Sequence, residues 1–159
     1  MIRNNLLAVV LHVVIVPVYY VSVTVLSALF HLYEPADQPV VWGCTLLAVV
    51  LYVVVGYVAQ DQGSAGRNLL SVLSPAVLLI AALAIDPFAD LASGVNLTGL
   101  RYALANVVFT TPIPVTGLAA SGKNVLAIVL AFLPTLLFWI GLQLKAWRRA
   151  RKVRTEAGR

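Results

Sequence analysis

Residues 6–32, LLAVVLHVVIVPVYYVSVTVLSALFHL, form an unbroken apolar run of 27 residues that decides the class of fold. The many valines would favour a strand in water, but in hydrocarbon every backbone group must be paired within the segment or in a closed barrel. Because the run is long and does not alternate between polar and apolar residues, it predicts a helix. Signal peptides have apolar cores of only about 7–15 residues, so we expect an uncleaved first membrane span.

Three further apolar runs follow, over residues 40–58, 69–85 and 125–146. The chain is 61% hydrophobic and only 11% charged, whereas a soluble domain carries about 25% charged residues. These features predict an all-α integral membrane protein with four transmembrane helices. We expect one four-helix domain over residues 1–147 and a basic cytoplasmic tail over residues 148–159.

Basic residues are unevenly divided between the two ends of the predicted spans. Of the eleven, seven lie at or after Lys145, and two more lie at the N-terminus and in the 59–68 loop. Arg101 and Lys123 would lie at the opposite end. The positive-inside rule therefore predicts that both termini are cytoplasmic, and we expect the cytoplasmic membrane of a bacterium. The confinement of the charge to one end also favours a membrane-anchored tail over a nucleic-acid-binding domain.

The connection over residues 86–124 is neither a clear span nor an ordinary polar loop. A crossing over residues 100–120 would put the basic tail outside the cell, and this stretch contains Pro112 and Pro114. Upstream of the prolines, apolar residues fall on one helical face and polar residues, Asn106 among them, on the other. We therefore expect an amphipathic helix that lies on the outer surface or a segment that re-enters the membrane.

Candidate ligand or partner residues come from this connection and from the first helix. The polar residues of the first helix gather on one arc, where they either form interhelical hydrogen bonds or line a substrate path. The acids near the start of the 86–124 connection are explained by helix capping, or else by a cation or acid/base site at the outer headgroups. The candidates are His12, Tyr19, Tyr20, His31, Asp86, Asp90, Arg101 and Asn106.

The basic cluster just inside the membrane is predicted to contact anionic headgroups. Its members are Lys145, Arg148, Arg149, Arg151 and Lys152. No metal site is predicted from the two histidines, because 19 residues within one helix separate them by about 28 Å. Residues 117–124 resemble a phosphate-binding loop but end in asparagine where the magnesium-binding hydroxyl is required. We predict no cofactor.

The sequence contains no recognisable set of nucleophile and base, and no acidic residue lies within a predicted span. It therefore favours a non-enzymatic accessory, assembly or immunity-type subunit that contacts another membrane protein or a second copy of itself. A small transporter or channel with a polar path along the first helix is the alternative. A third hypothesis is a lipid-modifying enzyme that uses Asp86, Asp90 and Arg101 at the outer face.

Overall fold

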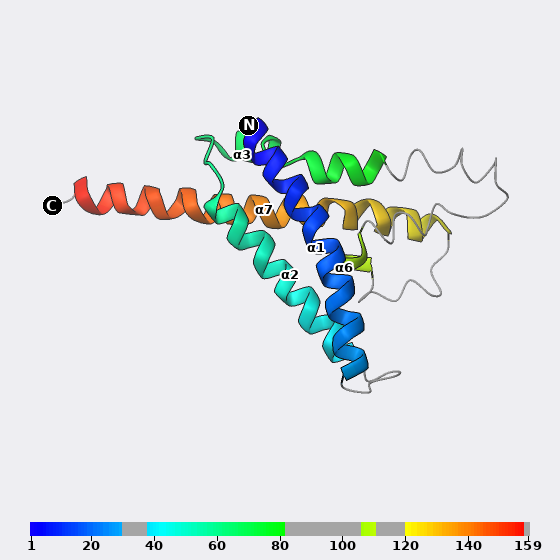
Figure 1. The fold of residues 1–159 in the computed structure, drawn as a ribbon. Coiled ribbons are helices and arrows are strands. Elements are labelled where there is room, and N and C mark those ends of the chain that lie inside the picture. The colour runs from blue at the N-terminus through cyan, green and yellow to red at the C-terminus, as the bar shows by residue number, and fades with distance from the viewer. Residues whose placement is uncertain (30–37, 82–105, 111–119, 158–159) are drawn as a thin grey trace.

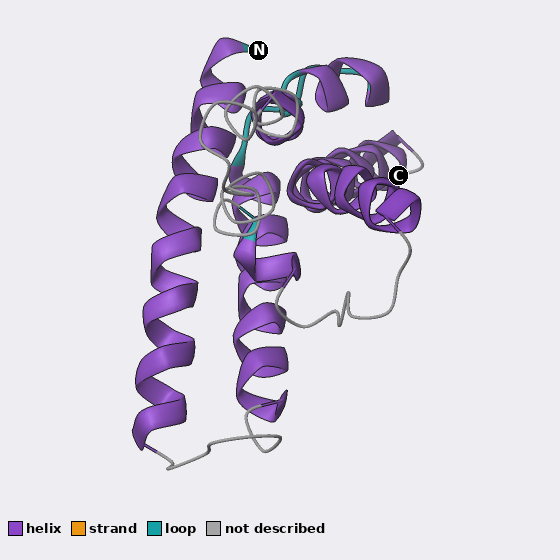
Figure 2. Ribbon diagram, turned by 90° about the vertical axis from the view of Figure 1, so that its right-hand side faces the viewer, coloured by secondary structure: helices purple, strands orange, loops and turns teal. Residues whose placement is uncertain are grey.

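The computed structural model describes residues 1–29, 38–81, 106–110 and 120–157. Their helices are α1 (Ile2–Leu29), α2 (Gln38–Val58), α3 (Ala65–Leu70), α6 (Val107–Thr110) and α7 (Ala120–Ala157), with a further helical segment over residues 74–81. Of these described helices, three are long and apolar enough to cross a membrane: α1, α2 and the Val125–Glu156 part of α7. α1 and α2 lie side by side, and α7 crosses them (Figures 1 and 2).

α1 and α2 pack as an antiparallel pair through one stripe of residues on each helix. The buried residues recur every three or four positions, which places them on one helical face. They are Asn4, Ala8, His12, Ile15 and Tyr19 on α1, and Val41, Thr45, Ala48, Tyr52 and Gly56 on α2. Hydrogen bonds join Asn4 to Gln60, His12 to Tyr52 and Tyr19 to Thr45. The two residue numbers of every pair have the same sum, so one fixed register runs the length of the pair.

α2 and α7 cross at two glycines, where their backbones touch. A Cβ atom on Gly56 would stand 2.9 Å from the carbonyl carbon of Phe138 and would overlap its oxygen, and one on Gly141 would stand 2.6 Å from the backbone nitrogen of Tyr57. Glycine is required at both positions because the space for a side chain is filled by backbone. Gly43, also on α2, has nothing within 4 Å of its Cβ position.

The prediction of one continuous helix over residues 69–85 is wrong for its described part. α3 ends at Leu70, a turn follows, and a helix begins again at residue 74. The first N–H groups of the new helix find partners elsewhere: that of Ser74 donates to Asn5 Oδ1 at 3.1 Å and that of Ala76 to Thr135 Oγ1 at 3.3 Å. Pro75 between them has no N–H to satisfy. The break is stable because α1 and α7 supply acceptors that replace a preceding helical turn.

α6 lies inside the helical assembly and contacts α1, α2 and α7. Asn106, predicted on the polar face of an amphipathic helix, is 0% exposed, as is Val108, and Phe109 is 4% exposed. Described residues on both predicted faces are thus covered, because α1, α2 and α7 lie against this turn. A helix on the outer surface, one of the two alternatives expected, would leave one face in water. α7 also differs from the predicted span of residues 125–146, since it begins at Ala120 and continues through the basic residues to Ala157.

Candidate functional site

The start of α1, the chain after α2, and α3 meet at a polar junction. Asn4 is 1% exposed, and its amide donates to the Gln60 carbonyl at 2.7 Å and to Ser71 Oγ at 3.1 Å while its oxygen accepts from the Gln60 N–H at 3.1 Å. Asn68, equally buried, accepts from the Gln62 N–H at 2.7 Å. Two asparagine side chains therefore hold the loop after α2 in place through its backbone.

Asp61 connects this junction to the basic part of α7. Its carboxylate accepts from the Gly63 N–H and the Asn68 amide, both at 3.0 Å, and lies 3.8 Å from the Arg149 guanidinium. The pKa of Asp61 is lowered, first by the Gly63 hydrogen bond, then by Asn68, and further by the charges of Arg149 and Lys145, although partial burial acts in the opposite direction. The carboxylate is thus held in its charged form.

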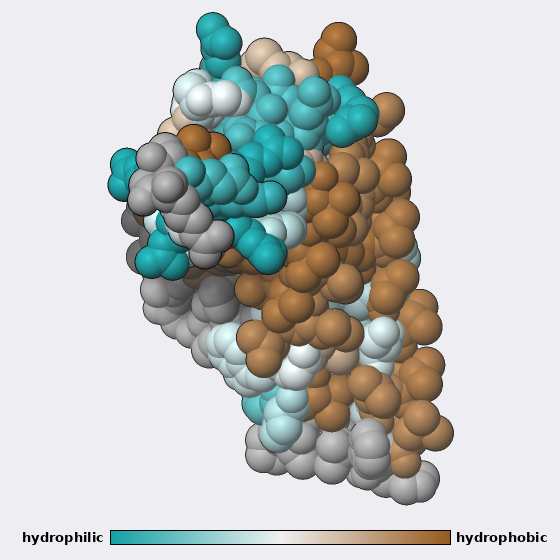
Figure 3. Space-filling view, turned by 90° about the vertical axis from the view of Figure 1, so that its left-hand side faces the viewer, coloured by the Kyte–Doolittle hydropathy of each residue, from teal (hydrophilic) through white to brown (hydrophobic). Residues whose placement is uncertain are grey.

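Four cations on α7 share one helical face beside the end of α2. The first is Lys145, and Arg148, Arg149 and Lys152 follow it by three, four and seven residues. Together with Tyr57, the four cations line a hollow of about 350 Å³. Arg148 donates to the Tyr57 hydroxyl at 2.8 Å. Hydrophilic residues gather at this end of the molecule, and hydrophobic residues cover α1 and α2 (Figure 3). The hollow therefore lies at the boundary between a charged surface and an apolar one.

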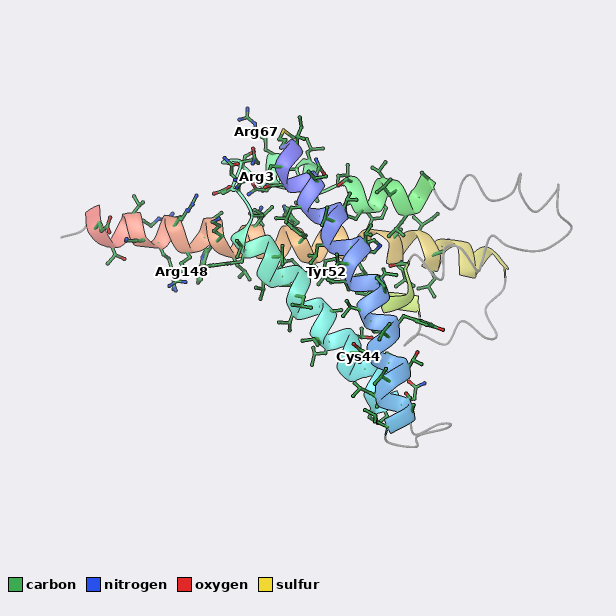
Figure 4. All side chains as sticks on the ribbon, viewed as in Figure 1. Arg3, Cys44, Tyr52, Arg67 and Arg148 are labelled. Carbon is green, nitrogen blue, oxygen red and sulfur yellow. The ribbon has the colours of Figure 1, made fainter. Side chains whose placement is uncertain are left out.

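A second polar group lies in the middle of the helices. His12 Nδ1 is 2.6 Å from the hydroxyl of Tyr52, which is 0% exposed and extends from α2 to α1 (Figure 4). Further along, Thr45 Oγ1 is 3.2 Å from the Tyr19 hydroxyl and 3.3 Å from the Val108 carbonyl oxygen. These polar side chains join α1, α2 and α6.

A shallow groove follows the α1–α2 pair. Its lining is mostly apolar or small, and its volume is about 40 Å³. The lining residues are Ile15, Val18, Tyr19 and Ser22 of α1 and Cys44, Leu47, Ala48 and Leu51 of α2. Small side chains in the lining of such a groove allow another helix to approach closely.

The structure brings some of the predicted site residues together and separates others. His12, Tyr19 and Asn106 are buried in or beside the central polar group. Tyr20 does not belong to this group, because it is 58% exposed on the outer side of α1. His31, Asp86, Asp90 and Arg101 lie outside the described residues.

The predicted headgroup cluster is also divided. Lys145, Arg148, Arg149 and Lys152 share the hollow beside Tyr57. The guanidinium of Arg151 instead lies 4.3 Å from the ring centre of Trp147, outside the hollow.

Several residues of the two polar groups were not found from the sequence. Asn4 and Asn68 lie at the ends of apolar runs, where a polar residue is expected in any case. Tyr52 is surrounded by valines in the predicted second span. One signal in the sequence was the helical spacing of Thr45, Tyr52 and Gly56, which places them on a single face of α2. This is the face that α2 buries.

Comparison with protein-family models, with curated proteins and with solved structures finds no match for this chain. Function is therefore inferred from the site.

Proposed function

We propose that this chain is an integral membrane protein that works as a non-enzymatic subunit by holding a transmembrane helix of another protein in the α1–α2 groove. The observation that carries the proposal is the groove itself, whose lining includes the small side chains of Ser22, Cys44 and Ala48. An occupant at this depth must satisfy its own backbone hydrogen bonds, which a helix does. Small side chains favour its close approach.

The packing of the polar residues supports a binding role over transport. His12 and Tyr52 are joined at 2.6 Å, and the ring centre of Phe109 lies 6.0 Å from that of Tyr52. These side chains form interhelical hydrogen bonds and ring contacts of the kind found inside a packed helical bundle.

We further propose that the chain has four spans with both termini in the cytoplasm of a bacterium, and that residues 74–81 belong to the third span. The support is that Arg3, Arg67 and the basic end of α7 belong to segments that meet at one junction (Figure 4). The positive-inside rule assigns such an end to the cytoplasm. The burial of Asn106, Val108 and Phe109 supports a re-entrant segment over a surface helix.

Cys44 provides the test because it lies in the groove and is the one cysteine of the sequence. A maleimide carrying a benzophenone is attached to Cys44 in native membranes and activated by light. We expect a covalent adduct with a second, different membrane protein. The control is the variant Cys44→Ser/Val13→Cys, because Val13 is exposed and lies two residues, about 200° of helical rotation, from Ile15 of the groove. Adducts with lipid alone, with a second copy alone, or equal capture by the control would overturn the proposal.

A small transporter or channel is the second candidate, and the chain of buried polar groups from His12 to Thr45 favours it. In that case replacing His12 and Tyr19 with apolar residues should abolish solute flux into vesicles while the protein stays folded. Unchanged flux in such a folded variant would exclude a path along α1.

A further inference from the structure

The hollow between Tyr57 and the basic face of α7 has the chemistry of an anion site. Lys145, Arg148, Arg149 and Lys152 line it, and a guanidinium binds phosphate oxygens through a planar pair of N–H groups. The site lies between α2 and α7, so it is separate from the α1–α2 groove and does not depend on the proposed partner.

Existing contacts hold the cations in place and leave donors for a ligand. Lys145 Nζ donates to the carbonyl oxygens of Val58 and Ala59, which anchors α7 to the end of α2. Arg148 uses one terminal nitrogen to donate to the Tyr57 hydroxyl, and a guanidinium has five N–H groups. Arg149 Nη1 is 3.8 Å from Asp61 Oδ2, too long for a hydrogen bond. These contacts thus orient the side chains but do not use all of their N–H donors.

The charge of the hollow also favours an anion. Among the described residues, two carboxylates lie near the four cations. Asp61 is beside Arg149, and Glu156 lies 3.8 Å from Lys152 on the exposed surface of α7. Such an exposed pair contributes little. The hollow therefore keeps a net positive charge that a phosphate would neutralise.

The apolar surface beside the hollow identifies the source of the phosphate. Val58, 68% exposed, ends the apolar surface of α2, and Leu144, 46% exposed, lies one residue before the first cation of α7. A ligand with its phosphate among the arginines has apolar surface directly beside it. We propose that the hollow binds the phosphate of an anionic phospholipid, whose acyl chains lie along the exposed apolar residues of α2 and α7.

The same helix provides a matched control for general electrostatic attraction. Arg151 stacks on Trp147, and Arg154, nine residues after Lys145, lies on the opposite side of α7 by helical rotation. Neither lines the hollow. Arg148→Gln/Arg149→Gln and Arg151→Gln/Arg154→Gln each remove two positive charges from α7, but only the first pair of substitutions removes the proposed ligands.

The experiment measures phospholipid retained by the detergent-solubilised full chain, counted by native mass spectrometry. Equal amounts of phosphatidylglycerol and phosphatidylcholine are offered. We expect the wild-type chain to bind one phosphatidylglycerol preferentially, with affinity lowered about tenfold or more in Arg148→Gln/Arg149→Gln and less than about threefold in Arg151→Gln/Arg154→Gln. Arg148→Lys/Arg149→Lys keeps the charge but loses the planar donors, and should lower affinity about fivefold.

Two results would overturn the proposal. Equal losses in the two glutamine variants would mean that the basic residues attract headgroups by charge alone. Displacement of the lipid by excess inorganic phosphate would mean that the hollow takes free phosphate. Thermal unfolding of each variant, followed by circular dichroism, checks that the helices are retained, and the lysine variant gives the answer if the glutamine variant unfolds. Failure here leaves the result at Cys44 unaffected.

Discussion

Replacing Gly56 with alanine should force α2 and α7 apart at their crossing. The new Cβ would stand 2.9 Å from the carbonyl carbon and 3.0 Å from the Cα of Phe138, whereas non-bonded carbon atoms rest at about 3.5–4.0 Å. The nearest obstructing atom is the Phe138 oxygen, which the Cβ would overlap, so the helices must separate by about 1 Å or more. Overpacking costs about 1–3 kcal/mol, and because the obstructing atoms are backbone that cannot rotate away, we expect a loss of about 2–3 kcal/mol in the free energy of unfolding.

Gly43→Ala is the matched control, since it lies on the same helix and nothing is within 4 Å of its Cβ position. Alanine there should be neutral or stabilise the protein by up to about 1 kcal/mol, because glycine is the poorer helix former. The assay is unfolding of the purified protein in mixed micelles by increasing mole fraction of dodecyl sulfate, followed by circular dichroism. If Gly56→Ala were as stable as Gly43→Ala, the backbone contact between α2 and α7 would be refuted.

The double variant Gly56→Ala/Gly141→Ala sharpens the same test. The two glycines lie at one crossing, where a Cβ on Gly141 would stand 2.9 Å from the carbonyl carbon of Gly56. Once one alanine has separated the helices, the second meets less resistance. The combined loss should therefore be smaller than the sum of the single losses, and strict additivity would argue against a shared contact.

Three further predictions concern the polar groups. Asn4→Ala should lower the free energy of unfolding by about 1–3 kcal/mol in the same micelle assay, since it removes a buried amide that holds the loop after α2. A change within about 0.5 kcal/mol would show that the Asn4 side chain does not hold this loop. Tyr52→Phe should cost about 1–3 kcal/mol, because its hydroxyl bonds to His12 in the interior, while Tyr20→Phe, on an exposed side chain, should change stability by less than about 0.5 kcal/mol. Asp61 has a folded-state pKa below its ordinary value, so its contribution is complete above the unfolded-state pKa, about 3.9, and is lost as the pH falls through the folded-state value. Thermal midpoints measured from pH 7 downward should fall more steeply in wild type than in Asp61→Asn, and parallel curves would contradict this.

Only one edge of the polar arc that the sequence predicts on α1 lies on the face that this helix buries. His12 and Tyr19 lie against α2 and α6 as the helical arc requires, while Tyr20 on the same arc is exposed. A single neighbouring helix covers a narrower strip than the arc that these residues span. How much of the arc is covered depends on where α2 and α6 pack against α1. The periodicity of the α1 sequence carries no information about the positions of those helices.

The sequence by itself determined that α1, α2 and α7 are helices of membrane-spanning length, because a long apolar run in hydrocarbon must satisfy its backbone within itself. It also determined that cations concentrate toward the C-terminal end of α7. Tertiary structure alone decided which glycines contact the backbone of a neighbouring helix and which arginines share a hollow with Tyr57. It also decided that a helix begins again at residue 74 after α3. The physical reason is that these features depend on the register and crossing of separate helices, and residues distant in sequence supply the atoms that fill a contact or accept an N–H.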